Sequence, residues 1–297
     1  MNTNTRNSDS PMWRSMLFVP AHLEKFVAKA HQRGADAYIL DLEDSVPTAE
    51  KSAARERVTA AAKQVSRDGA AALVRINQPL RLAIRDLEAC INPAIDAVVL
   101  PKVSNADQVK SLCEVIDELE IEGGMKPGHT LVIAQIECAH ALTELDAIAK
   151  SSPRLLGMIL GSEDFSASVG MEPTPLGLFA PNQAVVLACR RAGILPFGFP
   201  ASIADYSDIE QFRERIRSAR QLGFVGAFCI HPIQVGVLND EFTPSAAELE
   251  QARQLIAAYE QGLSEGKGAV EFQGKMIDAP VVARARELLR TTARVEL

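Results

Sequence analysis

The sequence predicts an α/β fold, a (β/α)8 barrel, and three observations support this prediction. Eight short runs of apolar, often β-branched residues alternate with stretches that have the apolar spacing of helices. The runs are continuously apolar, which is typical of strands buried on both faces of a parallel sheet. No break in composition interrupts the alternation, as expected for one barrel of roughly 250 residues. The predicted strands are Ser15–Val19, Ala37–Leu42, Ala72–Ile76, Ala97–Leu100, Leu131–Ile136, Leu156–Leu160, Ile194–Phe197 and Ala227–Ile230.

An open, doubly wound parallel sheet is the competing architecture, because it is built from the same alternation. Sheets of that kind that bind dinucleotides carry a GxGxxG segment after the first strand, and none follows Ser15–Val19 here. Glycine-rich loops are also sparse, so the barrel is favoured. The predicted helices are Leu23–Arg33, Glu50–Ser66, Ala106–Leu119, Ala141–Lys150, Asn182–Ala192 and Asp208–Leu222.

The chain is predicted to have three parts. Residues 1–12 are rich in Asn, Thr and Ser without an apolar segment, so they form a disordered N-terminal tail rather than a signal peptide. Residues 13–240 form the barrel, and residues 241–297 form a C-terminal helical extension that carries a lid.

The C-terminal extension begins with a well-marked helix. Ser245 and Glu248 have the spacing of a capping box ahead of a helix over Ala246–Gln261. This helix is expected to end at the first glycine of Gly262–Gly268, a predicted flexible hinge. Val270–Leu297 then forms a small module outside the barrel, which indicates a lid.

Charge and composition exclude several classes of function. The formal net charge is −7 and Lys and Arg are scattered singly, so neither nucleic acid nor an anionic membrane is an expected partner. No apolar stretch approaches the roughly 20 residues that a membrane-spanning helix needs. The five cysteines are odd in number and lack a CxxC pair, which argues against both a disulfide framework and a zinc site. A reducing, cytoplasmic location fits this cysteine usage best.

Carboxylates follow two of the predicted strands and indicate a metal site. Glu137 ends the fifth strand and Asp164 follows the sixth, at the face of a barrel where active sites lie. Converging carboxylates favour a hard cation with oxygen ligands, so Mg²⁺ is expected, with Mn²⁺ as a substitute. The alternative is that both acids only cap the helices that follow them.

Other polar residues lie at the ends of the second and third predicted strands. Asp41, Glu43 and Asp44 are expected to support the site, with one or two anchoring loops by hydrogen bonds or by salt bridges to Lys51 or Arg55. Arg75 lies in an otherwise apolar run, where its charge would be costly without an anionic partner. Two alternatives are an ordinary surface role for Arg75 and a structural role for His231, which ends the eighth strand.

Six motifs in the same order resemble the citrate lyase β-subunit-like family of the HpcH/HpaI aldolase superfamily. The resemblance extends from Arg14 to about Leu289, and the layout is most similar to malyl-CoA and citramalyl-CoA lyases. The motifs are Arg14–Pro20, Leu40–Val46 with Lys51 and Arg55 following, Val74–Asn77, Leu100–Val103, Ile136-Glu137 and Leu160–Asp164.

The resemblance implies a barrel enzyme that assembles as a trimer or hexamer and binds Mg²⁺ through the residues matching Glu137 and Asp164. It also implies that Arg75 contacts the thioester carbonyl, and that Arg14 and Lys102 contact the substrate or its thioester carrier.

The segment Phe272–Pro280 resembles the lid of the coenzyme-A members, whose catalytic aspartate matches Asp278. In those relatives the lid reaches a neighbouring subunit. Asp278 could instead cap the helix that follows it. Two features depart from the family pattern: Ala21 stands where many relatives have Gly, and Phe199–Asp205 differs from the usual seventh-strand motif.

The expected activity is a Mg²⁺-dependent retro-Claisen cleavage of a short 3-hydroxyacyl-CoA, of citramalyl, malyl or citryl type. The products are a 2-keto acid and an acyl-CoA. One alternative is a citrate lyase β-subunit that acts on a citryl thioester of an acyl-carrier protein. The other is a barrel that binds a ligand without catalysis.

Overall fold

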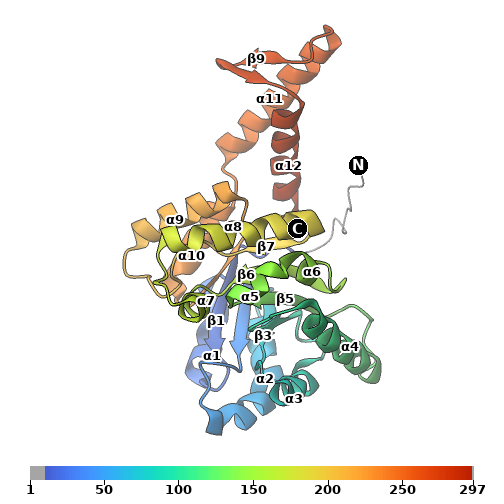
Figure 1. The fold of residues 1–297 in the computed structure, drawn as a ribbon, viewed down its shortest axis with the longest axis vertical. Coiled ribbons are helices and arrows are strands. Elements are labelled where there is room, and N and C mark those ends of the chain that lie inside the picture. The colour runs from blue at the N-terminus through green and yellow to red at the C-terminus, as the bar shows by residue number, and fades with distance from the viewer. Residues whose placement is uncertain (1–10, 296–297) are drawn as a thin grey trace. The chain divides into compact units, whose positions relative to one another are not determined.

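All eight predicted strands form and lie side by side in one parallel sheet, which closes almost completely into a barrel (Figure 1). The structure is a computed structural model that describes residues 11–295. The strand order is β7-β6-β5-β4-β3-β2-β1-β8, and a bridge between Phe197 and Gly226 links the two ends. The predicted barrel is therefore confirmed. Its strands are β1 Ser15–Pro20, β2 Ala37–Asp41, β3 Ala71–Arg75, β4 Ala97–Leu100, β5 Leu131–Ile136, β6 Leu155–Leu160, β7 Leu195–Phe197 and β8 Ala227–Cys229.

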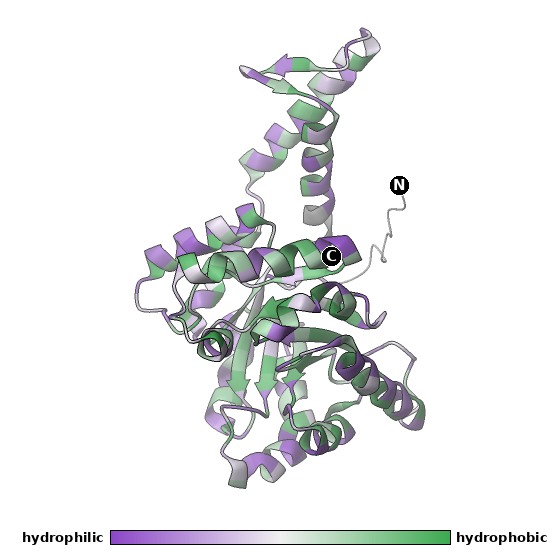
Figure 2. Ribbon diagram, viewed as in Figure 1, coloured by the Kyte–Doolittle hydropathy of each residue, from purple (hydrophilic) through white to green (hydrophobic). Residues whose placement is uncertain are grey.

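Side chains along each strand alternate between the barrel interior and the surrounding helices. In β5, Ile133 belongs to the inner cluster together with Leu73 and Val99, whereas Val132 and Ala134 belong to the cluster beneath the helices. Both faces are thus buried, which explains why the strands are continuously apolar. Figure 2 shows the hydrophobic residues concentrated on the strands and hydrophilic residues along the helices.

Helices surround the strands. They are α1 Glu24–Ala30, α2 Lys51–Val65, α3 Leu80–Cys90, α4 Ala106–Glu122, α5 Ala139–Thr143, α6 Leu145–Ala149, α7 Ser162–Val169, α8 Pro175–Ala192, α9 Ile209–Leu222 and α10 Pro232–Phe242, with short 3-10 turns η1 His31–Arg33 and η2 Thr48–Glu50. Helices α3, α7 and α10 were not predicted. The helix predicted over Ala141–Lys150 is divided at Glu144, whose backbone leaves the helical region. Helix α8 begins at Pro175, because Thr174 caps it by accepting a hydrogen bond from the N–H of Gly177.

The chain divides into two compact units with the boundary between Phe242 and Thr243. The second unit contains α11 Ala246–Ser264, an antiparallel hairpin of β9 Val270–Phe272 and β10 Lys275–Ile277, and α12 Ala279–Val295. Its small core includes Tyr259, Ile277 and Val282.

The first helix of this second unit begins as predicted but ends later. Ser245 and Glu248 form the predicted capping box, so that prediction is confirmed. The prediction that the helix ends at Gly262 is wrong, because α11 continues to Ser264. A Cβ atom at Gly262 would lie 2.1 Å from Cγ1 of Val270, so this glycine permits close packing of the hairpin. It is not the first residue of a hinge.

Of the predicted N-terminal tail, only Pro11 and Met12 belong to the described residues, and both are half-buried. Within residues 11–295, no helix is long and apolar enough to cross a membrane.

Candidate active site

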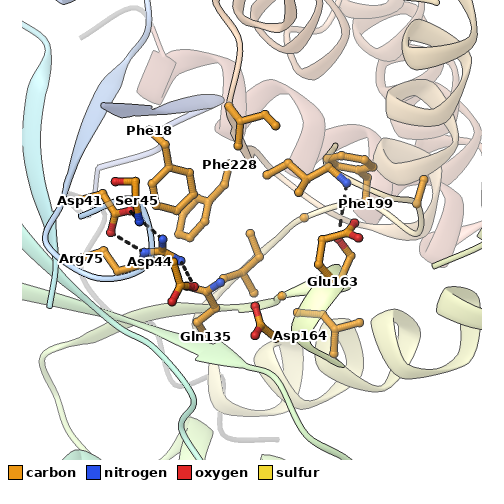
Figure 3. A pocket seen from close by; sticks show the side chains of 18 of the residues that line it. Phe18, Asp41, Asp44, Ser45, Arg75, Gln135, Glu163, Asp164, Phe199 and Phe228 are labelled. Carbon is orange, nitrogen blue, oxygen red and sulfur yellow. Dashed lines mark hydrogen bonds and ion pairs between the residues drawn. The ribbon is translucent and has the colours of Figure 1, made fainter. Parts of the chain in front are cut away.

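The carboxyl ends of the barrel strands open into a cavity of about 500 Å³ (Figure 3). Its lining comes from β1, β2, β3, β5, β6 and β8 and from the segments that follow β2, β6, β7 and β8. Active sites of (β/α)8 enzymes lie at this end of the barrel. The charged and polar lining residues are Asp41, Asp44, Ser45, Arg75, Gln135, Ser162, Glu163 and Asp164.

Glu137 and Asp164 lie close enough to influence each other's ionisation. Glu137 follows β5 and is only 4% exposed, whereas Asp164 lies in the first turn of α7 and lines the cavity. Burial raises the pKa of Glu137 to about 8, and the negative charges of Asp164 and Glu43 act in the same direction. Such a pair of carboxylates needs a positive partner, which a divalent cation would supply.

The backbone at the start of α7 is built closely around Glu137. A Cβ atom at Gly161 would lie 2.6 Å from Oε1 of Glu137, so only glycine permits this approach. In the part of the chain that the structure describes, no group of three His, Cys, Asp or Glu side chains could hold a metal ion. Two carboxylates suffice for Mg²⁺, which keeps several water or substrate oxygens, so the residues fit this ion better than zinc.

Arg75 ends β3 and is surrounded by acidic side chains. It donates hydrogen bonds of 2.8 Å from Nε and Nη2 to the two oxygens of Asp41, and its Nη1 lies 3.2 Å from Glu43 and 3.8 Å from Asp44. Its guanidinium carbon is 4.7 Å from the ring centre of Phe18. Burial opposes the charge of Arg75, but the hydrogen bonds from Arg75 to Asp41 and the nearby carboxylates outweigh it and raise its pKa. The guanidinium is therefore held rigidly at the edge of the cavity.

The loop after β2 is organised by Asp41. The backbone N–H groups of Glu43 and Ser45 donate to its carboxylate at 3.0 Å. Of the two predicted alternatives for loop anchoring, hydrogen bonds are thus the one that Asp41 uses, and no salt bridge joins Asp41, Glu43 or Asp44 to Lys51 or Arg55 among the described residues. Lys51 donates from Nζ to the carbonyl oxygens of Leu42 and Glu43, and Arg55 pairs with Asp86.

Lys102 connects the acidic loop to the carboxylate pair. Its backbone N–H donates to Oε2 of Glu137 at 2.5 Å, and its Nζ lies 2.8 Å from Glu43, 3.6 Å from Asp44 and 4.0 Å from Asp164. Its φ of 52° is in the left-handed region, which is uncommon for a non-glycine residue. This backbone conformation aims the N–H at Glu137 while the ammonium reaches the loop after β2.

A second cavity of about 540 Å³ adjoins the first. Phe18, Pro20 and Ile230 line both cavities. The remaining lining of the second cavity comes largely from the helical segment after β1 and includes three basic residues, Lys25, Lys29 and Arg33. The described residues thus form an acidic cavity at the barrel mouth and a basic groove next to it.

Residues 14–232 match the HpcH/HpaI aldolase/citrate lyase family. The chain belongs to this family. It is 36% identical to citrate lyase subunit beta of Escherichia coli K12, over 96% of this chain and 93% of that protein. It is 34% identical to L-malyl-CoA/beta-methylmalyl-CoA lyase of Rhodobacter capsulatus, over 93% of each chain. Among solved structures, CitE of Mycobacterium tuberculosis in complex with magnesium, acetoacetate and coenzyme A has a TM-score of 0.75 at 30% identity, covering 97% of this chain and 100% of that one.

The family assignment confirms the resemblance of the six sequence motifs to the citrate lyase β-subunit-like family. It also confirms the predicted class of enzyme, because the related citrate lyase subunits and malyl-CoA lyases are carbon–carbon lyases. The structural relatives with bound magnesium show that Mg²⁺ binding occurs in the family.

Most of the predicted site residues of this family member lie together at the barrel mouth. The structure brings together Asp41, Glu43, Asp44, Arg75, Lys102, Glu137 and Asp164.

Arg14, Asp278 and His231 are not part of this cluster. Arg14 precedes β1, at the opposite end of the strand from the cavity, and pairs with Asp36 at 2.6 Å. The structure thus places Arg14 apart from the cavity, and its contact with the thioester carrier stays a prediction. Asp278 belongs to the second unit, where Oδ1 accepts a hydrogen bond from the N–H of Val281 at the start of α12. His231 stacks on Tyr206 with ring centres 4.6 Å apart.

Gln135 and the basic groove were not predicted from the sequence. Gln135 lines the cavity, is 6% exposed and donates from Nε2 to Oε1 of Glu137 at 3.0 Å. A signal was present, because a polar residue inside an apolar strand run needs a buried partner, as was recognised for Arg75. Gln135 and Glu137 are also two positions apart and so face the same side of the strand.

Proposed function

We propose that this protein is a Mg²⁺-dependent lyase that cleaves a short 3-hydroxyacyl-CoA into a 2-keto acid and an acyl-CoA. The observation that carries the proposal is that Asp164 and the buried Arg75 line one cavity, and that the buried Glu137 lies close enough to Asp164 to be influenced by its charge. This arrangement combines a site for a hard cation with a fixed positive charge, which are the two groups that a retro-Claisen cleavage needs. Oxygen ligands of this kind also suit Mn²⁺ as a substitute.

Mg²⁺ held by Glu137 and Asp164 would supply a positive centre for the hydroxyl and carboxylate oxygens of the acyl group and lower the hydroxyl pKa. Lys102 and Gln135 keep the Glu137 carboxylate in place through their hydrogen bonds. The N-terminus of α7, which begins at Ser162, adds a favourable dipole for the substrate carboxylate.

Arg75 stabilises the charge that develops when the carbon–carbon bond breaks. A base accepts the hydroxyl proton, and the hydroxyl carbon becomes the carbonyl carbon of the departing keto acid as the carbon–carbon bond breaks. The bonding electrons move to the α-carbon of the thioester, which becomes an enolate with charge on its oxygen. Asp41 and Glu43 hold the guanidinium of Arg75 in place, and its positive charge at the cavity edge stabilises that oxygen.

A proton must then reach the α-carbon to complete the acyl-CoA product. Asp278 is our candidate for this donor, supplied by the C-terminal unit of a neighbouring subunit in a trimer or hexamer. Its carboxylate also caps α12, so one side chain would have both a structural and a catalytic role.

Charge favours coenzyme A over an acyl-carrier protein as the thioester carrier. The basic groove offers Lys25, Lys29 and Arg33 to the phosphates of a nucleotide carrier, and it adjoins the acidic cavity at Phe18 and Ile230. A thioester arm lying across these shared residues would connect the two cavities. The 36% identity to a citrate lyase subunit keeps a carrier-protein thioester as the second candidate.

An assay of thioester cleavage tests the proposal. Purified protein is incubated with citramalyl-CoA, malyl-CoA or citryl-CoA, in Mg²⁺ or in EDTA, and release of the keto acid is followed. We expect cleavage of at least one thioester in Mg²⁺, loss in EDTA and recovery with Mn²⁺. A citryl thioester of an acyl-carrier protein serves as the comparison. Cleavage of that substrate alone would support the second candidate, and no cleavage of any substrate would contradict both.

A further inference from the structure

The cavity at the barrel mouth has two chemically different sides. Figure 3 shows Arg75, Gln135 and Asp164 along one side and the aromatic rings of Phe18, Phe228 and Phe199 along the other. The apolar side continues after β7 and β8 through Ala201, Ile203 and Ile230. The described residues that line the cavity include one cation, Arg75, which is already paired with Asp41, Glu43 and Asp44.

The proposed function, on which this inference rests, gives a role to three sides of the barrel mouth. The metal-binding carboxylates follow β5 and β6, and Arg75 ends β3. The carrier reaches the cavity between β1 and β8, where Phe18 and Ile230 border the basic groove. The side that remains lies between β6 and β7, and its lining residues are Ile159, Phe199, Ala201 and Ile203.

In a substrate held by the metal-binding carboxylates, Arg75 and the carrier groove, the fourth substituent of the carbon that bears the hydroxyl would face this remaining wall, formed by Ile159, Phe199, Ala201 and Ile203. That substituent is hydrogen in malyl-CoA, methyl in citramalyl-CoA and carboxymethyl in citryl-CoA. The carboxymethyl group carries a second carboxylate, and the wall supplies no cation to pair with it. An unpaired carboxylate against apolar side chains is strongly unfavourable.

The charged side chain that is tied to the loop of this wall is itself an anion. Glu163 lines the cavity and accepts a hydrogen bond of 2.6 Å from Ser202, which lies between Ala201 and Ile203. The side chain of Glu163 is thereby held beside the wall, where it would repel a second carboxylate. A methyl group would instead gain apolar burial at the same place.

We infer that the site selects acyl groups with a single free carboxylate and a small alkyl substituent on the hydroxyl-bearing carbon. The keto acid released is then one with an apolar side chain, of the pyruvate class. Citramalyl-CoA is the preferred substrate, malyl-CoA is poorer by roughly 10-fold because it lacks one methyl group, and citryl-CoA is the poorest. This order separates the two kinds of relative, a citrate lyase subunit and a malyl-CoA lyase, that match the chain about equally well.

A comparison of substrates on the wild-type protein tests the inference. The ratio kcat/KM is measured for the three thioesters in Mg²⁺, and binding of pyruvate and of oxaloacetate to the Mg²⁺-loaded protein is measured by calorimetry. We expect citramalyl-CoA to exceed citryl-CoA by at least ~10-fold, with pyruvate bound in preference to oxaloacetate. A smaller or reversed ratio overturns the inference but leaves the proposed lyase intact. Absence of cleavage with all three overturns both.

A substitution that adds a cation to the wall provides a second test. Ile203→Arg is expected to raise the citryl-to-citramalyl ratio of kcat/KM by ~10-fold relative to wild type. Ile233→Arg is the matched control, because Ile233 is half-exposed on α10 and lines neither cavity, so its ratio should equal that of wild type. An unchanged ratio in folded Ile203→Arg, or an equal change in the control, overturns the inference. Ile203 contacts two core clusters, so the folding of Ile203→Arg is checked by circular dichroism. If this variant does not fold, the comparison of substrates on the wild-type protein tests the inference alone.

Discussion

The side-chain amide of Gln135 donates a hydrogen bond of 3.0 Å to Oε1 of Glu137, from two positions earlier on the same side of the chain. The other oxygen of Glu137 accepts the backbone N–H of Lys102. Both carboxylate oxygens are thus oriented before any cation binds. This pre-arrangement reduces the reorganisation that metal binding requires, and it makes Gln135 a positioning residue for Glu137.

Gln135→Met should weaken Mg²⁺ binding without unfolding the barrel. Methionine has a similar size but cannot donate to Glu137, and loss of such a supporting hydrogen bond costs roughly 10- to 100-fold in metal affinity. Calorimetric titration with Mg²⁺ measures the effect. Gln183→Met on α8, away from the cavity, is the control and should bind Mg²⁺ as wild type does. Equal affinity in both variants would show that Gln135 does not position Glu137.

Arg75→Lys should lower kcat by ~100-fold, because an ammonium cannot reproduce the planar fork that Arg75 presents to Asp41 and to an enolate oxygen. Steady-state kinetics with the preferred thioester measure the loss. It should affect mainly kcat if Arg75 acts on the developing charge, and mainly KM if it only holds the ground state. Arg55→Lys makes the same chemical change at the Arg55–Asp86 pair outside the cavity and should leave kcat unchanged. Wild-type kcat in Arg75→Lys would refute the assigned role.

The metal-free protein should become less stable as pH rises. Burial raises the pKa of Glu137 to about 8, whereas in the unfolded chain it titrates near its ordinary value of about 4.3. Between these values the folded state holds a proton that the unfolded state lacks, so the free energy of unfolding decreases with increasing pH. Glu137→Gln cannot ionise and lacks this contribution.

Thermal unfolding in EDTA between pH 5 and 8 checks this prediction. The Tm of Glu137→Gln minus that of wild type should increase steadily across this range. A difference that stays constant with pH would mean that Glu137 is already ionised in the metal-free protein.

Two substitutions separate the structural role of Asp278 from its chemical role. Asparagine caps helices about as well as aspartate but has no acid to donate, whereas alanine lacks both properties. We expect Asp278→Asn to keep wild-type stability and lose at least ~100-fold in kcat, within the range of a general acid. Asp278→Ala should lose the same activity and also some stability of the C-terminal unit, measured by thermal unfolding. Wild-type activity in Asp278→Asn would show that Asp278 caps α12 but does not donate the proton.

Mixing experiments test whether Asp278 serves a neighbouring subunit. Asp164→Ala and Asp278→Ala should each be nearly inactive alone. After demonstrated subunit exchange, mixed oligomers pair an intact metal site with an intact Asp278, so activity should reappear. Failure to recover activity would show that each C-terminal unit serves its own chain.

Sequence reasoning predicted the barrel and much of its mouth because strand ends in a (β/α)8 fold converge. Glu137, Asp164 and Arg75 follow or end apolar runs, and the fold brings such positions together. The position of Arg14 apart from the cavity could not be predicted, because the motif that contains it extends to both ends of β1 and a resemblance does not show which end a residue occupies. Gly262 was misread because a glycine that permits close packing looks in sequence like one that ends a helix.

The short helices and the substrate-facing wall were beyond sequence reasoning. Helices α3, α7 and α10 have at most 11 residues each, so few turns carry the apolar periodicity that predicts a helix. The wall formed by Ile159, Phe199, Ala201 and Ile203 joins one residue of β6 to three residues of the loop after β7. Its apolar character at the cavity depends on which side chains face inward, and the sequence does not give that for loops.

The metal site itself is best probed by calorimetric titration with Mg²⁺ of the wild-type protein and of Glu137→Ala and Asp164→Ala, because each substitution removes one oxygen ligand without removing a core contact. Glu163→Ala is the matched control, since Glu163 adjoins Asp164, lines the same cavity and pairs with Ser202 instead. We expect one Mg²⁺ per wild-type chain, similar binding in the control, and no measurable binding in either ligand variant while all four proteins remain folded. Undiminished Mg²⁺ affinity in both Glu137→Ala and Asp164→Ala would show that these carboxylates do not hold the metal.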